Sequence, residues 1–246
     1  MSSLQIVPVH HVPEITPGSN LSARLREGIR ASGLEIERGD ILAVTQKIIS
    51  KAEGRIVKLN DVSPSDLTLS IAEQVKKDPR LVEVILRETR RIVRMRADVL
   101  VCETHHGFIC ANAGVDSSNI ESGSVTLLPK DPDRSARDLA QYLGCGVIVT
   151  DTFGRVWREG LLDAAIGIGG VPPLLDLRGK TDTYGNPLHV TVLASSDALA
   201  AAAGLVMGKT NGTPAALIRG FRWEQTDGGD HTIKALLRAP ERDLFL

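Results

Sequence analysis

The sequence contains few aromatic residues and has no excess of positive charge. Phe, Trp and Tyr make up 3% of its 246 residues, and the formal net charge is -1 at pH 7. Few side chains are therefore available to stack on bases, and no basic excess neutralises a phosphate backbone. Both features argue against a nucleic-acid-binding protein and favour a small-molecule partner.

Cysteines and long apolar runs are scarce as well. Cys102, Cys110 and Cys145 are too few and too scattered for a disulfide framework or a zinc site. Reduced core thiols in a cytosolic protein are the plain interpretation. No apolar run is long enough to span a bilayer, and residues 1–9 lack the basic-then-apolar pattern of a signal peptide. We therefore expect a cytoplasmic protein without membrane segments.

The distribution of apolar residues predicts a mixed α/β (α+β) fold with mixed sheets and packed helices. Hydrophobic residues make up 42% of the chain, enough for one large domain or two small ones. Helical patterns separate several short runs rich in Val, Ile and Leu, in an order that neither alternates regularly nor is all-β. Strands are predicted at 4–9, 41–45, 99–103, 108–113, 125–128, 147–150, 190–194 and 215–219.

Four helices have recognisable ends. Apolar residues at helical spacing run from 21 until Gly33, and residues 63–66 combine a hydroxyl cap, a proline and an acid at a helix start. Asp78-Pro79 opens the next helix in the same way, and an alanine-rich helix spans 197–207. By contrast, the glycine-rich stretch 160–186 is predicted to be mostly an ordered loop, and such long loops are usually functional.

Three glycine-bearing segments resemble nucleotide-binding motifs without matching them. Residues 179–181 and 208–210 both contain Gly-Lys-Thr, the end of a P-loop, but neither has the glycine required five positions earlier. In 167–172, Pro172 stands where a dinucleotide-binding fingerprint has its third glycine. The prediction is therefore neither a P-loop nor a Rossmann fold, although each segment could still lie near a phosphate.

Small polar residues follow the predicted strand at 108–113. Gly114 permits a sharp turn, Asp116 offers a carboxylate to a hard cation, and Asn119 offers an amide to a ligand. The same groups could instead cap their own backbone in an Asx-type turn. Spacing alone leaves both interpretations open.

A second acidic residue follows the predicted strand at 147–150. Asp151 and Thr152 stand where strand-end groups commonly hold Mg²⁺ against phosphates, with Asp151 paired to a nearby arginine as the alternative. Two acid-bearing strand ends predict a two-carboxylate site for Mg²⁺ that substrate phosphates complete. Lys51, beyond the strand at 41–45, is the candidate phosphate contact, with a solvated surface lysine as its alternative.

Together these segments resemble the coenzyme F420 gamma-glutamyl ligase family. The likeness spans nearly the whole chain, and several motifs in the right order are more specific than any one alone. The motifs are SKAEGR at 50–55, NAGVDSSN at 112–119, DTFGR at 151–155, WREG at 157–160, AIGIGGV at 165–171, DLRGKTDTYG at 176–185, LVMGK at 205–209 and PAALIRG at 214–220.

The resemblance implies a GTP-dependent acid–amino-acid ligase of coenzyme F420 biosynthesis. The terminal carboxylate of the deazaflavin precursor F420-0 would take the γ-phosphoryl group of GTP, and L-glutamate would displace phosphate from the resulting acyl phosphate. An ionised carboxylate needs no general base for the first step, so a missing catalytic triad is expected. The resemblance further implies Mg²⁺ or Mn²⁺, K⁺ as a further candidate ion, and a homodimer. Residues 1–246 would form one ligase unit, divisible into two subdomains and without the reductase domain fused to some relatives.

By position, the resemblance also implies roles for individual residues. Asp116, Asp151 and Thr152 match divalent-metal ligands, and Asp116, Asp151 and Lys51 are the candidate catalytic residues. Lys209 stands where archaeal relatives carry an acidic metal ligand. Its positive charge could replace that of a second metal, or its presence could mean that only one metal binds tightly. The nucleotide-binding candidates are Val12, Pro13, Glu14, Ile15, Thr45, Gln46, Lys51, Asn119, Met207, Gly208, Lys209 and Thr210.

Two other functions remain open. The first is an NTP-dependent amino-acid ligase that acts on another carboxylate-bearing cofactor or metabolite. The second is a non-catalytic nucleotide- or deazaflavin-binding protein, for which Lys209 is the only support. Glutamylation of F420-0 separates the first from the leading hypothesis, and GTP binding without turnover would favour the second.

Overall fold

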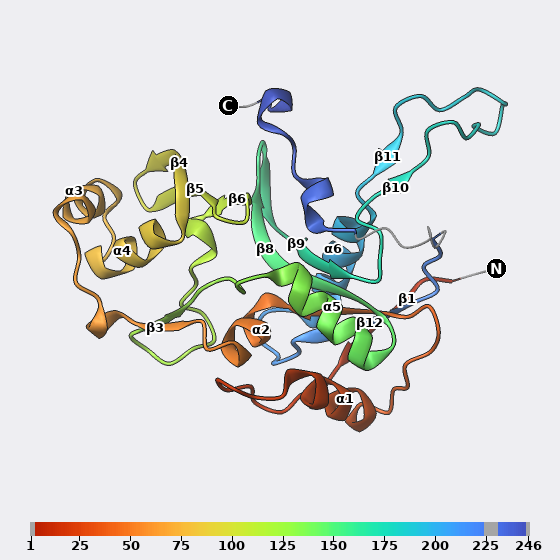
Figure 1. The fold of residues 1–246 in the computed structure, drawn as a ribbon, viewed down its shortest axis with the longest axis horizontal. Helices are drawn as coiled ribbons and strands as arrows, with labels where there is room; N and C mark the ends of the chain where they lie inside the picture. The colour runs from red at the N-terminus through yellow and green to blue at the C-terminus, as the bar shows by residue number, and fades with distance from the viewer. Residues whose placement is uncertain (1–2, 224–230, 245–246) are drawn as a thin grey trace.

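The computed structural model describes residues 3–223 and 231–244 and confirms the predicted mixed α/β fold (Figure 1). Its centre is a five-stranded sheet in which β2 and β8 run parallel, while the other neighbouring pairs are antiparallel. In spatial order the strands are β1 (Gln5–Val9), β12 (Ala215–Arg219), β2 (Ile41–Thr45), β8 (Gly146–Arg155) and β9 (Arg158–Gly169).

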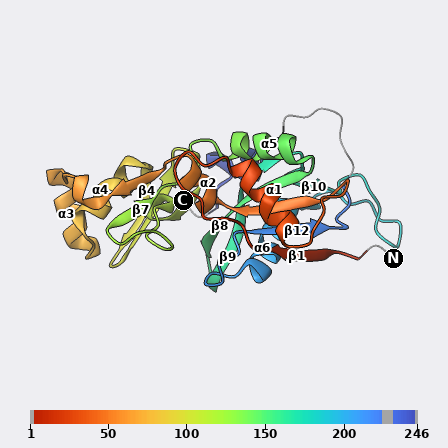
Figure 2. The same ribbon diagram turned by 90° about the horizontal axis from the view of Figure 1, so that it is seen from below.

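Helices cover both faces of this sheet (Figure 2). On one face lie α1 (Leu21–Ala31) and α5 (Pro132–Leu143), and on the other lies α6 (Ser195–Met207). The short helix α2 (Gln46–Ala52) begins directly after β2. The larger of two hydrophobic clusters fills the space between the sheet and these helices, with Leu25, Leu42, Ile148 and Ile166 fully buried.

A smaller lobe extends from the central sheet (Figure 1, left). It contains a second hydrophobic cluster, in which Val75 and Ile85 of two helices meet Leu100 of a three-stranded sheet. Its elements are α3 (Asp66–Val75), α4 (Pro79–Arg87), β4 (Thr89–Arg96), β5 (Val99–Thr104) and β6 (Ile109–Ala111). The remaining elements are β3 (Ile56–Lys58), β7 (Ser124–Thr126), β10 (Leu175–Asp176), β11 (Val192–Leu193) and the short helices η1 (Leu59–Asp61), η2 (Asn112–Gly114), η3 (Ile233–Leu236) and η4 (Pro240–Arg242).

Every predicted strand overlaps an observed one, but the glycine-rich stretch 160–186 was wrongly predicted to be mostly loop in its first part. Strand β9 occupies this part and ends at Gly169. Its last glycines let α5 pack directly against the strand. A Cβ on Gly167 would lie 2.5 Å from the carbonyl carbon of Pro132, and one on Gly169 would overlap the backbone of Ala136. These glycines serve close packing between a helix and a strand, which composition alone does not distinguish from a loop.

The helix starts follow the predicted capping chemistry with one correction. Asp78 caps α4 and accepts from the Arg80 amide, as expected, but α3 is capped by Ser65 and not by Ser63, so its proline precedes the cap. Asp131 caps α5 in the same way as Asp78, with a proline at the first helical position, although that helix was not predicted.

The three cysteines are free and buried, as the sequence analysis expected. Burial raises the pKa of the Cys110 and Cys145 thiols to about 12, and it also raises the pKa of Cys102. Separately, none of the helices in the described ranges is both long and apolar enough to cross a bilayer.

Candidate functional site

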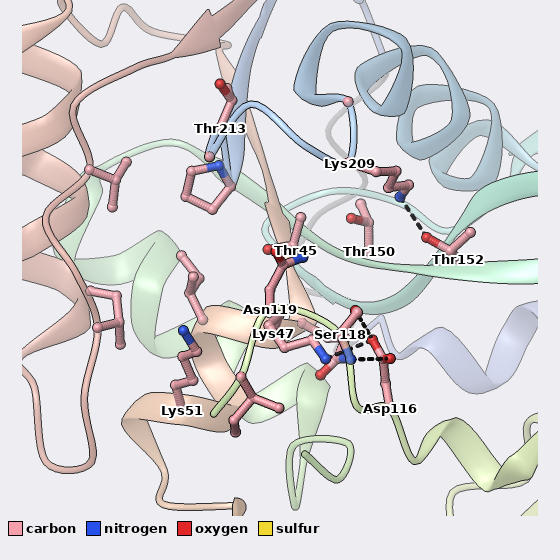
Figure 3. A pocket seen from close by; sticks show the side chains of 18 of the residues that line it. Thr45, Lys47, Lys51, Asp116, Ser118, Asn119, Thr150, Thr152, Lys209 and Thr213 are labelled. Carbon is pink, nitrogen blue, oxygen red and sulfur yellow. Dashed lines mark hydrogen bonds and ion pairs between the residues drawn. The ribbon is translucent and has the colours of Figure 1, made fainter. Parts of the chain in front are cut away.

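A cavity of about 570 Å³ lies at the carboxyl end of β2, beside the parallel strand β8 (Figure 3). Parallel strands place the chain that follows them at one edge of a sheet, which is where such proteins usually bind ligands. Five segments line the cavity: 12–15, the β2–α2 junction, the loop from Asp116 to Glu121, the paired strands β8 and β9, and the loop 208–214.

Most of the residues predicted for the site do line this cavity. The exceptions are Met207, which is buried in the core at the end of α6, and Thr210, which lies in the loop that follows. The predicted residues that line it are Val12, Pro13, Glu14, Ile15, Thr45, Gln46, Lys51, Asn119, Gly208, Lys209, Asp116, Asp151 and Thr152.

A tight turn after β6 holds Asp116 at the cavity. Asn112 and Ala113 both adopt left-handed backbone conformations (φ 53° and 52°), which is costly for residues with a Cβ. Asp116 then exchanges two backbone hydrogen bonds with Thr126 of β7. The Ser118 amide donates to Asp116 Oδ1 at 2.8 Å, so the Asx-type turn considered from the sequence is present. It coexists with exposure of the carboxylate to the cavity.

Positive and hydrogen-bonding groups surround the Asp116 carboxylate. The Lys47 ammonium lies 2.6 Å from its Oδ2, and the Ser118 hydroxyl donates to the same oxygen at 2.6 Å (Figure 3). Burial alone would raise the pKa of Asp116, but the bonds from Lys47 and Ser118 outweigh it and hold this pKa below its ordinary value. Asp116 is therefore an ionised, oriented carboxylate.

Asp151 has the opposite environment. It lies within β8, which continues past the predicted end at residue 150 as far as Arg155. Burial, together with the nearby charges of Asp116 and Asp163, raises the pKa of Asp151 to about 6, against the lowering effects of the Thr152 amide and the Lys47 charge. No salt bridge joins Asp151 to an arginine within the described ranges, and the Arg155 guanidinium instead donates to the Glu159 carbonyl.

A third aspartate, Asp163, also lines the cavity, and it was not predicted from the sequence. It lies opposite Thr152 in the β8–β9 ladder, and the Thr152 hydroxyl donates to its Oδ1 at 2.6 Å. The Lys209 ammonium lies 2.6 Å from that same Oδ1 and from the Thr152 hydroxyl (Figure 3). Asp163 is only 6% exposed, and its Oδ2 has no hydrogen-bond partner among the described residues.

The match to known proteins covers this whole site. The family model described as F420-0:Gamma-glutamyl ligase matches residues 10–220, which include all five segments of the cavity. The chain belongs to this family.

Curated members of the family resemble the chain over almost its full length. It is 45% identical over 253 residues to the coenzyme F420:L-glutamate ligase of Methanopyrus kandleri, covering 100% of the chain and 98% of that protein. It is 43% identical over 251 residues to the protein of the same name in Methanothermobacter thermautotrophicus, with 98% of each chain covered. The corresponding Archaeoglobus fulgidus protein is 36% identical over 249 residues.

In this member of the family, the acidic residues suit a cation that substrate oxygens help to hold. Within the two described ranges, no group of three or more His, Cys, Asp or Glu side chains is arranged to hold a metal ion. Asp151 nevertheless forms no salt bridge there, and one oxygen of Asp163 is buried without a partner. Mg²⁺ commonly binds one or two carboxylates and takes its remaining ligands from phosphates and water, so the donor set fits.

Lys47 is another cavity residue that the sequence analysis missed. It precedes Lys51 by four residues in α2, so both side chains lie on one face of that helix and both line the cavity. Lys51 pairs with Glu14 at 2.8 Å, whereas Lys47 pairs with Asp116. The i, i+4 spacing would have indicated Lys47 had residues 46–52 been recognised as a helix.

Proposed function

We propose that this chain is a coenzyme F420:L-glutamate ligase that uses GTP to join L-glutamate to the F420-0 precursor through an amide bond. One observation carries most of the proposal. A single cavity gathers three aspartates and three lysines from segments that are up to about 160 residues apart, as Lys47 and Lys209 are, inside a chain that belongs to the ligase family.

In the first step, a carboxylate oxygen of the acceptor forms a bond to the γ-phosphorus of GTP while the bond to the β–γ bridging oxygen breaks. GDP leaves with that oxygen, and an acyl phosphate remains. Catalysis of such a transfer rests on holding the reactants in line and on neutralising phosphate charge. Lys47, Lys51 and Lys209 line the cavity and can supply that charge.

Asp116, Asp151 and Thr152 would hold the divalent cation, Mg²⁺ or Mn²⁺, which supplies further charge neutralisation on the phosphates when bound. The opposite electrostatics of the two carboxylates suit this arrangement. Asp116 is kept ionised by its protein partners, whereas Asp151 has no salt-bridge partner in the described part of the chain and would gain most from a cation.

In the second step, the neutral amine of L-glutamate bonds to the acyl carbon, and inorganic phosphate leaves. The amide nitrogen then loses a proton. Segment 208–214 reaches the end of β2, where the Thr45 amide donates to the Pro214 carbonyl, and segment 12–15 lines the same cavity. We assign the nucleotide to this part of the site. The loop from Asp116 to Glu121 supplies Asn119 as an amide that can contact the same ligand.

The test is a complete ligation assay on the purified full chain with F420-0, GTP, L-glutamate and Mg²⁺ or Mn²⁺. We expect F420-0 to gain the mass of one glutamyl residue, with one GDP released per amide formed. Omission of glutamate, replacement of GTP by ATP, and the variant D151N are the controls. GTP turnover without glutamylated product would redirect the proposal to another carboxylate acceptor, and binding of GTP without turnover would refute catalysis.

A further inference from the structure

The two short lysine–carboxylate contacts in the cavity have the same composition but different surroundings. In each, an ammonium lies 2.6 Å from a carboxylate oxygen and also reaches a threonine hydroxyl, that of Thr126 for Lys47 and that of Thr152 for Lys209. The Asp116 side chain is 43% exposed, whereas that of Asp163 is 4% exposed. The contacts therefore differ in what would follow if the lysine moved away.

If Lys47 left Asp116, the carboxylate would keep two other donors, the amide and hydroxyl of Ser118. It would also face the cavity, where water or a cation can reach it. If Lys209 left Asp163, the Thr152 hydroxyl would still donate to Oδ1, but the carboxylate would lose its counter-charge while buried, and its Oδ2 has no partner among the described residues. That loss carries a large free-energy cost. Of the two lysines, only Lys47 can exchange its partner cheaply.

A divalent cation on Asp116 would force such an exchange. The Lys47 ammonium already contacts Oδ2, and a dication bound to the same carboxylate would repel it at a separation of a few ångströms. The Lys47 side chain extends from α2, is only 13% exposed and lines the same cavity as Lys51, so an ammonium released from Asp116 remains within the site.

We propose that Lys47 is an exchangeable cation, whose ammonium neutralises Asp116 in the free protein and transfers to the phosphates of the nucleotide when a divalent cation occupies Asp116. The inference rests on the proposed nucleotide and cation site, and it adds a phosphate-binding residue to that site. Its consequence is thermodynamic coupling. The cation alone must displace Lys47, whereas cation and nucleotide together give the displaced ammonium a new anionic partner, so each ligand tightens the other by the same factor.

The test measures binding of Mn²⁺ and GDP, without ligation, in wild type and in K47M. We expect K47M to bind Mn²⁺ alone about 10-fold more tightly than wild type, because the competing ammonium is gone. With Mn²⁺ saturating, we expect K47M to bind GDP about 10-fold more weakly, because a charge-assisted hydrogen bond to phosphate is lost. The factor by which GDP tightens Mn²⁺ should shrink accordingly. Electron paramagnetic resonance of free Mn²⁺ and calorimetry of GDP binding provide the two readouts.

The matched control is K51M, which removes the same charge from the same helix face without touching Asp116. It should leave the Mn²⁺ affinity of the GDP-free protein close to that of wild type, while K47R, which keeps the charge, should bind Mn²⁺ as weakly as wild type. K47Q, a second neutral variant, serves if K47M does not fold.

Equal or weaker Mn²⁺ binding by a folded, neutral variant in the absence of GDP would overturn the inference, as would undetectable Mn²⁺ binding by wild type and variants alike. Failure of the proposed function has a different signature. It would appear as absence of glutamylated product with wild type, whatever the Mn²⁺ affinities of the variants.

Discussion

Two parts of the cavity wall supply carboxylates for the same predicted purpose, yet they hold them in opposite ways. Asp116 lies on a turn of the smaller lobe, and Lys47 and Ser118 lower its pKa. Asp151 lies inside a strand of the central sheet, where burial and neighbouring carboxylates raise its pKa to about 6. The turn is electrostatically balanced without a ligand, and the strand is not. For the proposed cation, the strand would therefore supply the stronger attraction, and the turn would fix its position.

The largest expected effect tests whether both carboxylates are needed despite this difference. D116N and D151N should each reduce GTP turnover in the ligation assay by about 1,000-fold, because each removes negative charge that a metal beside phosphate requires. Release of GDP is the measurement. A rate equal to that of wild type in either variant would remove that residue from the metal site.

The second prediction concerns the packing of β9, the strand that pairs with the Asp151-bearing strand β8. G169A should lower the free energy of unfolding by about 3 kcal/mol, because its Cβ would overlap the backbone of α5 and push that helix from β9. Denaturant unfolding is the measurement. The matched control is G154A in the adjacent strand, where an added Cβ meets nothing within 4 Å, and its effect should stay within about 0.5 kcal/mol. Equal effects would contradict close packing as the reason for the glycines.

The third prediction uses the pH dependence of stability to test the raised pKa of Asp151, in protein freed of divalent cations with EDTA. Folding raises this pKa from 3.8 to about 6, so the contribution of the carboxyl to stability is fully present below about pH 4 and is lost as pH rises through 6. D151N cannot ionise there. Its stability relative to wild type should therefore increase by about 2 kcal/mol between pH 4 and pH 6.5 and then level off. Thermal or urea unfolding across this range provides the measurement. If the difference in unfolding free energy between D151N and wild type stayed constant with pH, the pKa of Asp151 would not be raised by folding.

The smallest expected effect compares the two lysines. K209M should lower the free energy of unfolding by about 1–2 kcal/mol, because it removes the counter-charge of the buried Asp163. The Thr152 hydroxyl that remains and the exposure of Lys209 itself limit the loss. K47M should cost less than about 1 kcal/mol, because Asp116 keeps Ser118 and reaches solvent. Urea unfolding at pH 7 compares both. A larger loss of unfolding free energy for K47M than for K209M would show that burial of the paired carboxylate does not decide the cost.

The candidate site was predictable from spacing where an acidic residue follows an apolar run. Asp116 and Asp151 were chosen in this way, and the structure brings both to one cavity, although Asp151 lies within β8 and not after it. Family resemblance, not spacing, contributed Thr45 and the segments at 12–15 and 208–214. The ligand roles assigned to these residues stay predictions.

The residues that were missed depend on register and on helix recognition. Asp163 meets Thr152 only because β8 and β9 pair across an irregularity between Val149 and Thr150, which shifts the ladder by one residue. Lys47 was missed because residues 46–52 follow a strand without a capping signal, and the Thr45 side chain makes no cap hydrogen bond there. Neither fact is visible in composition or in short motifs.

The buried thiols have a practical consequence for following ligand binding by spectroscopy. Thiol-selective dyes react with thiolates, and at neutral pH the Cys110 and Cys145 side chains are almost entirely protonated as well as shielded. A single cysteine introduced at Tyr184, which is 91% exposed, would then carry a fluorophore on the otherwise native chain. The wild-type sequence is thus already a suitable background for site-directed labelling.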